Sequence, residues 1–269
     1  MKVYLDAVSL YGPGLPGWDA SLPLLRGETS YSGGDLPAFA SALLPATERR
    51  RAGKSVKLAI EIAQQAAQQC GIDPATPAMV FASSSGDTDV LSAICESLAG
   101  DDRLISPTRF HNSVHNAPAG YWSIAVGSRQ PSNSIACREI TAAAGLLEAA
   151  TQCVVEQTPV LLAVYDIPFP FPMNAAEPIT TAFGSALVLQ PHATAHSRFS
   201  LDLELIPGTS AAPACDGALE SLRRGVPAAR LLPLLQLLAN DMDGTVQLDY
   251  IEPHALRLSL TRCGQRGAA

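Results

Sequence analysis

Hydrophobic residues recur along the chain with two different periods. Apolar positions at spacings of four and three place one face of a helix on residues 56–70, within a helix that begins near Ala46 and stops at Gly71. Further helices are expected over residues 87–98, 117–126 and 140–156. Short apolar runs bounded by turn residues predict strands, namely 2–10, 78–82, 132–136, 159–165, 182–189 and 200–205.

Strands and helices therefore alternate before a closing run of strands. This order predicts an α/β layered domain with helices packed on a mixed sheet. Residues 159–165 are almost continuously apolar, which is typical of a strand covered on both faces. Residues 13–45 hold many Gly, Pro and Ser residues and predict a long irregular segment.

The pattern changes after Pro207. Residues 208–217 predict a loop, and residues 226–240 a Leu-rich helix that Pro233 interrupts. Two later segments, 245–251 and 256–260, form either a hairpin or edge strands. We therefore expect a principal domain over residues 1–207 and a C-terminal appendage, residues 208–269, packed on the same domain.

The charge and hydrophobicity of the chain indicate which kinds of molecule it binds. The chain has 269 residues, of which 18 are Lys or Arg and 25 are Asp or Glu, giving a net charge of −7. This acidic balance argues against nucleic acid or an anionic membrane as the main partner. With 47% hydrophobic and only 16% charged residues, the chain has a large core and a charge-poor surface, as expected where a partner buries part of it.

No uncharged apolar run reaches 18 residues, so no membrane span is expected. The start of the chain, Met1 to Asp6, becomes acidic too early for a signal peptide. Six scattered cysteines lack the spacing of zinc ligands. We therefore expect a reduced, cytoplasmic protein without a metal or cofactor.

A sharp turn joins the strand ending at Ala136 to the helix beginning near Ile140. Helix N-termini offer free N–H donors and the positive end of the helix dipole. A cysteine in such a turn has a lowered pKa and acts as a nucleophile. The turn is therefore a candidate site for nucleophilic chemistry.

Two motifs around this turn carry a resemblance to a known family. They consist of Ser106, Pro107, Asn116, Ala119 and Gly120, then of Gly127, Pro131, Ser132, Ser134, Ile135 and Ala136. Through them the chain resembles the N-terminal half of β-ketoacyl synthases over roughly residues 1–190. The resemblance implies a thiolase-like fold in which only the N-terminal ketosynthase half is present.

The register of the resemblance places a carboxylate at the nucleophile position. In ketosynthases the nucleophilic Cys stands five residues after the Ser that matches Ser134, and here that residue is Glu139. Cys137 lies two residues earlier and is the fallback thiol if the register shifts. Acyl transfer to a carboxylate would give a high-energy mixed anhydride, so we expect no catalytic residue here.

The remaining ketosynthase machinery is also missing from the sequence. Ketosynthases take two histidines and a lysine from a C-terminal half, and we expect this chain to end too soon to contain one. No H-x-G-T pattern follows Gly208. Three of the five histidines of the chain, His192, His196 and His254, stand in loop-like contexts and are expected at the surface.

The segment before the turn is a candidate partner surface. In ketosynthases the matching segment crosses the dimer interface and helps to close the partner's acyl tunnel. The resemblance thus assigns interface or tunnel contacts to Phe110, His111, Val114, His115, Asn116 and Ala117. Ordinary packing within the domain is the alternative. His111 and His115 lie four positions apart, but no third metal ligand is evident.

The function expected from this resemblance is that of a non-catalytic, chain-length-factor-like subunit. It would pair with a full-length β-ketoacyl synthase and an acyl carrier protein in polyene or fatty-acid-type elongation, with aryl polyene pigment synthesis as the specific pathway. Two alternatives stay open. One is a stand-alone condensing or decarboxylating acyltransferase acting on carrier-protein thioesters, and the other is a carrier-protein docking module.

Overall fold

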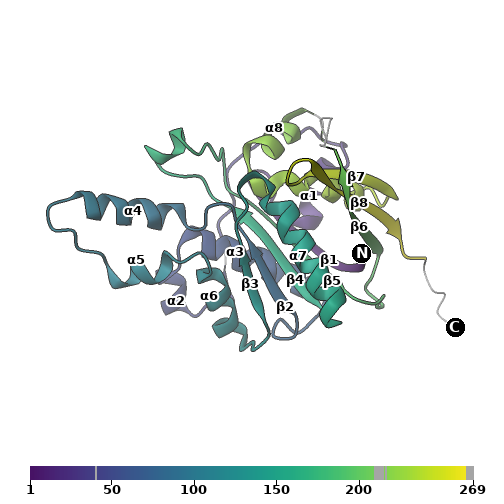
Figure 1. Cartoon of the computed structure of the whole chain (residues 1–269), viewed down its shortest axis with the longest axis horizontal. Helices are drawn as coiled ribbons and strands as arrows, with labels where there is room; N and C mark the ends of the chain where they lie inside the picture. The colour runs from purple at the N-terminus through teal and green to yellow at the C-terminus, as the bar shows by residue number, and fades with distance from the viewer. Residues whose placement is uncertain (40, 209–214, 216, 265–269) are drawn as a thin grey trace.

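One mixed sheet forms the centre of the molecule (Figure 1). The computed structural model describes residues 1–39, 41–208, 215 and 217–264. Eight strands follow one another across the sheet in the order β3-β2-β4-β5-β1-β6-β8-β7. Their bounds are β1 Lys2–Tyr11, β2 Ala78–Ala82, β3 Ser132–Ile135, β4 Val160–Asp166, β5 Phe183–Gln190, β6 Phe199–Pro207, β7 Gly244–Asp249 and β8 His254–Arg262. The predicted α/β architecture with a mixed sheet is confirmed.

Strand direction divides the sheet into two parts. Strands β3, β2 and β4 run parallel, whereas β5, β1, β6, β8 and β7 each pair antiparallel with their neighbours. Every residue of β2 and β4 is buried. The continuous apolar sequences of these strands follow from this position, because helices cover both of their faces.

Helices form a layer on each side of the sheet (Figure 1). The α-helices are α1 Trp18–Leu25, α2 Ala46–Arg51, α3 Lys54–Cys70, α4 Thr88–Ala99, α5 Pro107–Asn112, α6 Ala117–Val126, α7 Thr141–Glu156, α8 Gly217–Gly225 and α9 Leu232–Ala239. Three 3₁₀ helices are η1 Arg138–Ile140, η2 Met173–Ala175 and η3 Pro227–Leu231. Helices α3 and α6 pack on one face, and α1, α7, α8, η3 and α9 on the other.

A single glycine lets α7 approach the sheet closely. A Cβ atom added at Gly145 would lie 2.6 Å from the Cβ of Ala82 and 3.3 Å from a methyl carbon of Leu162. These distances are shorter than ordinary van der Waals contact, so α7 occupies this place only because residue 145 has no side chain. The close packing fixes the helix whose first turn follows β3.

The helix expected from Ala46 to Cys70 is two helices, with the break at Ala52 and Gly53. The break follows from a close approach, since a Cβ at Gly53 would lie 1.9 Å from Asp87 Oδ2. Asp87 caps α4 by accepting a hydrogen bond from Val90 N at 3.1 Å, and it also accepts one from Ser55 Oγ at 2.8 Å. Gly53 therefore makes room for a cap that joins α3 to α4.

Three short helices were not expected from the sequence. Helix α1 lies inside the segment predicted to be irregular, and it buries Trp18 and Leu25 in the core. Helices α5 and α8 contain only six and nine residues. Helices this short are marginal by themselves, so tertiary contacts rather than a long apolar period stabilise them.

The C-terminal residues extend the same sheet. The predicted hairpin is confirmed, because β7 pairs antiparallel with β8, and β8 pairs with β6. Pro233 does not interrupt a helix but lies in the first turn of α9, directly after η3. Of the loop predicted over residues 208–217, positions 209–214 and 216 lie outside the described residues.

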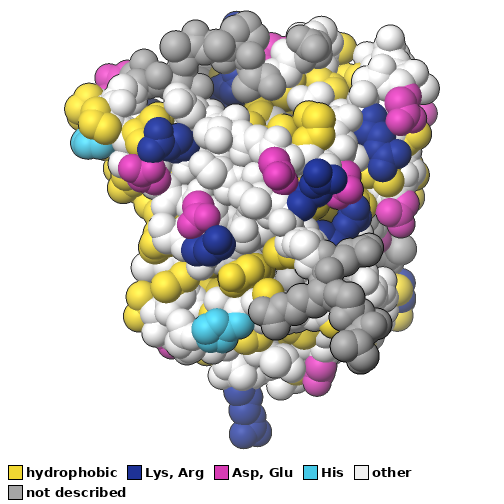
Figure 2. Space-filling model, turned by 90° about the vertical axis from the view of Figure 1, so that its right-hand side faces the viewer, with side chains coloured by type: hydrophobic (Ala, Val, Ile, Leu, Met, Phe, Trp, Pro, Cys, Tyr) yellow, Lys and Arg dark blue, Asp and Glu magenta, His cyan; other side chains and the backbone are white. Residues whose placement is uncertain are grey.

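Charged side chains of both signs are scattered over the face at the β6–β8 end of the molecule (Figure 2). Several form ion pairs in this part of the structure, including Arg198 with Asp241 at 3.2 Å and Arg262 with Asp243 at 3.7 Å. None of the helices described is both long and apolar enough to cross a membrane.

Candidate functional site

The turn between β3 and α7 is held in shape by its own residues. Thr141 Oγ1 accepts a hydrogen bond from Cys137 N at 2.9 Å and donates one to Arg138 O at 2.6 Å. Arg138 has a φ of 50°, in the left-handed region that residues other than glycine seldom occupy. The sharp turn predicted from the sequence is therefore present, and it contains a strained residue.

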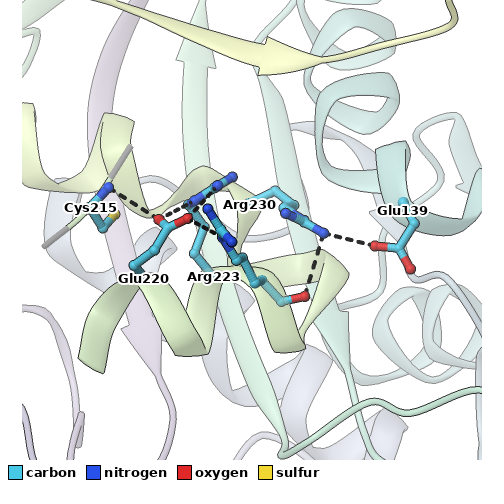
Figure 3. Close-up of polar contacts among 6 residues, drawn as sticks. Glu139, Cys215, Glu220, Arg223 and Arg230 are labelled. Carbon is cyan, nitrogen blue, oxygen red and sulfur yellow. Dashed lines mark hydrogen bonds and ion pairs between the residues drawn. The ribbon is translucent and has the colours of Figure 1, made fainter. Parts of the chain in front are cut away.

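Glu139 points out of this turn toward a helix from the C-terminal part of the chain (Figure 3). Its Oε2 accepts a hydrogen bond from Arg230 Nη2 at 2.9 Å. The Glu139 side chain is 68% exposed and that of Arg230 only 19%. Neither Glu139 nor Cys137 caps α7 with its side chain, because the cap residue is Ile140 and makes no such bond. The ion pair is thus the principal contact of the Glu139 carboxylate.

A second cluster of charges fixes the neighbouring helix α8 (Figure 3). Glu220 accepts hydrogen bonds from Arg223 Nε at 2.7 Å, from Arg224 Nε at 2.6 Å and from Cys215 N at 3.2 Å. These donors, Arg223 first, lower the pKa of Glu220 to about 2 despite its partial burial. Since the carbonyl oxygen of Arg224 accepts from Arg230 Nη2 at 3.4 Å, the cluster also supports the Arg230 side chain.

A cavity of about 350 Å³ lies beside the turn. Its apolar wall contains Leu91, Phe169, Pro178, Ile179 and Pro227, and its polar groups are Ser84, Ser85, Arg138, Glu139, Glu177 and Arg224. None of these described lining residues is a histidine, a lysine or a cysteine. The cavity therefore offers hydroxyl, carboxylate and guanidinium groups, but not the imidazole and thiol groups on which condensing enzymes rely.

Asp166 lies at the end of β4 and is completely buried behind this cavity. Its Oδ1 accepts hydrogen bonds from Ser84 N and Ser84 Oγ, both at 2.8 Å, and from Ser83 Oγ at 3.2 Å. Its Oδ2 accepts from Ala228 N at 2.8 Å. Burial nevertheless outweighs these donors and raises the pKa of Asp166 to about 6. The run of serines after β2 thus surrounds a buried carboxylate.

The residues of the predicted partner surface divide into two groups. Phe110 is 65% exposed and Val114 is 50% exposed, and both lie in the α5 region. Asn116 is also exposed, at the start of α6, without a side-chain capping bond. Ala117, by contrast, is only 8% exposed and belongs to the core on the α3 side of the sheet. Only the first group is available to a partner without rearrangement.

The two neighbouring histidines make different contacts. The ring of His111 packs edge-on against Tyr121 with the ring centroids 6.4 Å apart. His115 Nε2 donates a hydrogen bond to the carbonyl oxygen of Ser83 at 2.9 Å. In the described part of the chain, no three His, Cys, Asp or Glu side chains come together as a possible metal site.

Sequence reasoning did not find Arg230 or the function of Asp166. Arg230 lies 91 positions from Glu139, in a region that has no counterpart in the motifs discussed above. Asp166 and the serines at residues 83–85 are each visible as polar residues that follow a buried strand. Both strands belong to the parallel part of the sheet, and the ends of parallel strands meet at one edge. This was the signal that could have placed Asp166 next to the serines.

Comparison with solved structures gives the same architecture. The complex of the ketosynthase ApeO with its chain length factor ApeC from Xenorhabdus doucetiae matches with a TM-score of 0.73 and 18% identity, over 96% of this chain and 99% of that chain. A β-ketoacyl synthase from Burkholderia phymatum matches with a TM-score of 0.72 and 12% identity, over 97% and 99% of the two chains.

A third structure has a similar match. It is the AntDE:AntF complex of a type II polyketide acyl-carrier protein with its ketosynthase, with a TM-score of 0.71 and 12% identity over 97% of this chain and 99% of that one. Comparison with curated proteins gives no match. The sheet, its helical layers and the strand-to-helix turn thus define a protein of the ketosynthase-like, thiolase-like fold class.

The family model for the N-terminal domain of β-ketoacyl synthases matches residues 27–232. The chain belongs to this family. The resemblance drawn from the motifs around residues 106–136 is therefore confirmed.

Proposed function

We propose that this chain is a non-catalytic, chain-length-factor-like subunit that pairs with an active β-ketoacyl synthase. The observation that carries the proposal is the state of the turn after β3. Glu139 stands at the position that the resemblance assigns to the nucleophile, and its carboxylate is paired with Arg230. A paired carboxylate does not attack a thioester, so the attacking thiol would come from the partner.

The edge of the sheet supports the pairing. Strand β3 is the last strand in the sheet order, and its outer backbone groups face no other described strand. Open edges invite pairing with another chain unless charges or prolines protect them, and none lies within residues 132–135. Helices α6 and α7, which contact β3, carry the exposed residues Ile124 and Val155. We propose this edge as part of the heterodimer interface.

A second apolar region lies on the arm formed by α4, α5 and their connection, which extends from the body in Figure 1. Its exposed apolar side chains are Leu98, Leu104, Phe110 and Val114, of which Leu104 is 78% exposed. Keeping such groups in water costs free energy that a partner surface would recover. The arm is therefore suited to lie against the ketosynthase and line its acyl tunnel.

The growing chain would be presented on an acyl carrier protein and extended at the partner's cysteine. The similarity to a ketosynthase–chain length factor complex supports this class of reaction. Aryl polyene synthesis is the specific pathway that we propose. Deletion of this chain distinguishes the proposal from a carrier-protein docking module without a tunnel function. Deletion of a docking module would abolish the product, whereas deletion of a tunnel-forming subunit would change the product's length.

Co-expression with a full-length β-ketoacyl synthase tests the proposal. We expect a stable heterodimer, measured by light scattering after co-purification. Leu104→Asp and Phe110→Asp should weaken the complex by desolvating a charge at the interface. Leu205→Asp is the matched control, because Leu205 is 47% exposed on β6 at the other end of the sheet. A stable monomer with no affinity for the ketosynthase would refute the proposal.

The same complex separates this proposal from the enzyme alternative. Replacing the partner's catalytic cysteine by alanine should abolish condensation, whereas Cys137→Ser should leave it unchanged. Condensation that survives the first change and is lost with the second would assign the thiol to Cys137 of this chain.

A further inference from the structure

Asp166 connects segments that are far apart in the sequence. Through Oδ1 its carboxylate fixes Ser83 and Ser84, which follow β2, and through Oδ2 it fixes Ala228 at the start of η3. The donors are backbone N–H and serine hydroxyl groups, and none of the hydrogen bonds described comes from a cation. A buried carboxylate that relies on neutral donors tolerates little displacement of any of them, because a lost bond leaves charge unsatisfied in a low dielectric.

From Ser83, a hydrogen bond leads to the proposed partner surface. The Ser83 carbonyl oxygen accepts from His115 Nε2 at 2.9 Å. A Cβ at Gly86 would lie 3.4 Å from His115 Cδ2, so the ring also packs on this loop. Residues 110–117, which contain the exposed Phe110 and Val114, are therefore attached to the loop that binds Asp166.

From Ala228, a second path leads to the turn after β3. Ala228 and Arg230 belong to the same 3₁₀ helix, η3. Arg230 Nη2 donates to Glu139 Oε2 at 2.9 Å. A shift of η3 against Asp166 would therefore change the ion pair that holds Glu139, and with it the access to Cys137 two residues earlier.

We propose that Asp166 is a positioning residue that couples the partner-facing segment 110–117 to the Glu139–Arg230 pair at the turn after β3. The proposal rests on the proposed function, since residues 110–117 are the proposed tunnel wall. A ketosynthase seated on this segment would move His115 and the Ser83 loop. Asp166 passes this displacement to η3 and thus sets the shape of the cavity beside the turn.

The experiment measures the rate at which N-ethylmaleimide alkylates Cys137, resolved by peptide mass spectrometry in the complex with the ketosynthase. His115→Ala removes the donor to Ser83 and should change this rate by about threefold or more, as expected for groups in one hydrogen-bond network. In an Asp166→Asn background the same His115→Ala change should have no effect on Cys137. His115→Gln, which keeps a donor, should restore the original rate.

One further variant and an internal control keep the test decisive. If Asp166→Asn does not fold, Ser84→Ala deletes one hydroxyl donor to Asp166 while leaving the carboxylate in place, and it should reduce the coupling. Cys263, which is partly exposed and follows β8 at the other end of the sheet, serves as the internal control, and its alkylation rate should not respond. Equal effects of His115→Ala in both backgrounds would overturn the coupling and leave Asp166 with a purely structural function.

Failure of this inference is distinguishable from failure of the proposed function. If the complex forms and changes at Phe110 alter the product length, but His115 and Asp166 act additively on Cys137, only the coupling is refuted. If no complex forms with the ketosynthase, the proposed function fails, while the coupling is still measurable in the chain by itself.

Discussion

Arg230 donates a hydrogen bond to Glu139 at 2.9 Å, although 91 positions separate the two residues. The pair joins the turn after β3 to η3, which belongs to the C-terminal part of the chain. The guanidinium of Arg230 holds the Glu139 carboxylate against η3, which is consistent with a structural function for this residue.

We expect Glu139→Ala to leave condensation by the heterodimer unchanged. Because the Glu139 side chain is 68% exposed, the loss of the ion pair should lower the free energy of unfolding by at most about 1 kcal/mol. The rate of product formation and urea unfolding measure the two effects, with Glu156→Ala at the other end of α7 as the control. Loss of condensation in a folded complex would instead give Glu139 a chemical function.

Larger side chains on the arm should shorten the product. Phe110→Trp and Val114→Trp add volume at exposed positions and should cost this chain little, yet they would fill the partner's tunnel. Mass spectrometry of the products measures the shift, and Leu205→Trp on β6 is the control. Unchanged product length with both variants would remove the tunnel assignment.

Ala117 should behave differently from its exposed neighbours. It is 8% exposed and packs in the core, so Ala117→Trp should overpack this chain and lower its stability by about 1–3 kcal/mol or more. Thermal unfolding distinguishes this loss from a change in the tunnel. A fully stable Ala117→Trp variant that shortens the product would place this residue in the tunnel after all.

The buried Asp166 gives stability a defined dependence on pH. Its pKa rises from 3.8 to about 6 on folding, so between these values the folded state binds more protons than the unfolded state. The free energy of unfolding should therefore fall as pH rises from about 4 to about 7, by about 3 kcal/mol in total. Above about pH 7 the carboxylate is ionised in both states and this contribution no longer changes.

Urea unfolding of the native chain and of Asp166→Asn over this pH range measures the effect. The variant should lack the downward slope between pH 4 and 6. Glu220 contributes the opposite slope, because its pKa is lowered to about 2, but that slope lies below pH 4.5. Equal slopes in the two proteins would mean that Asp166 does not titrate in this range.

Two glycines in helices should respond oppositely to alanine. Gly145→Ala places a Cβ 2.6 Å from Ala82 and should lower stability by about 1–3 kcal/mol. Gly120→Ala, in α6, meets no atom within 4 Å and should raise stability by about 0.5–1 kcal/mol through helix propensity. Thermal unfolding checks both, and equal effects would contradict the close packing of α7 on β2.

Local sequence patterns determined most of the fold. Three features depend only on neighbours within a few positions and could therefore be predicted from the sequence. They are the apolar runs of β2 and β4, the helical face from Val56 to Cys70 and the helix stop at Gly71. The motifs around residues 106–136 were sufficient for the family, because many positions matched in one register. The same register is the basis for proposing that Glu139 occupies the nucleophile position.

Only the tertiary structure decided what these residues touch. The break at Gly53, the burial of Ala117, the pairing of Glu139 with Arg230 and the four hydrogen bonds to Asp166 all depend on segments that are distant in sequence. Periodicity records whether a position is apolar, but it does not record which chain segment lies opposite. Those contacts are set by the order of strands in the sheet, which brings the ends of β2, β3 and β4 together.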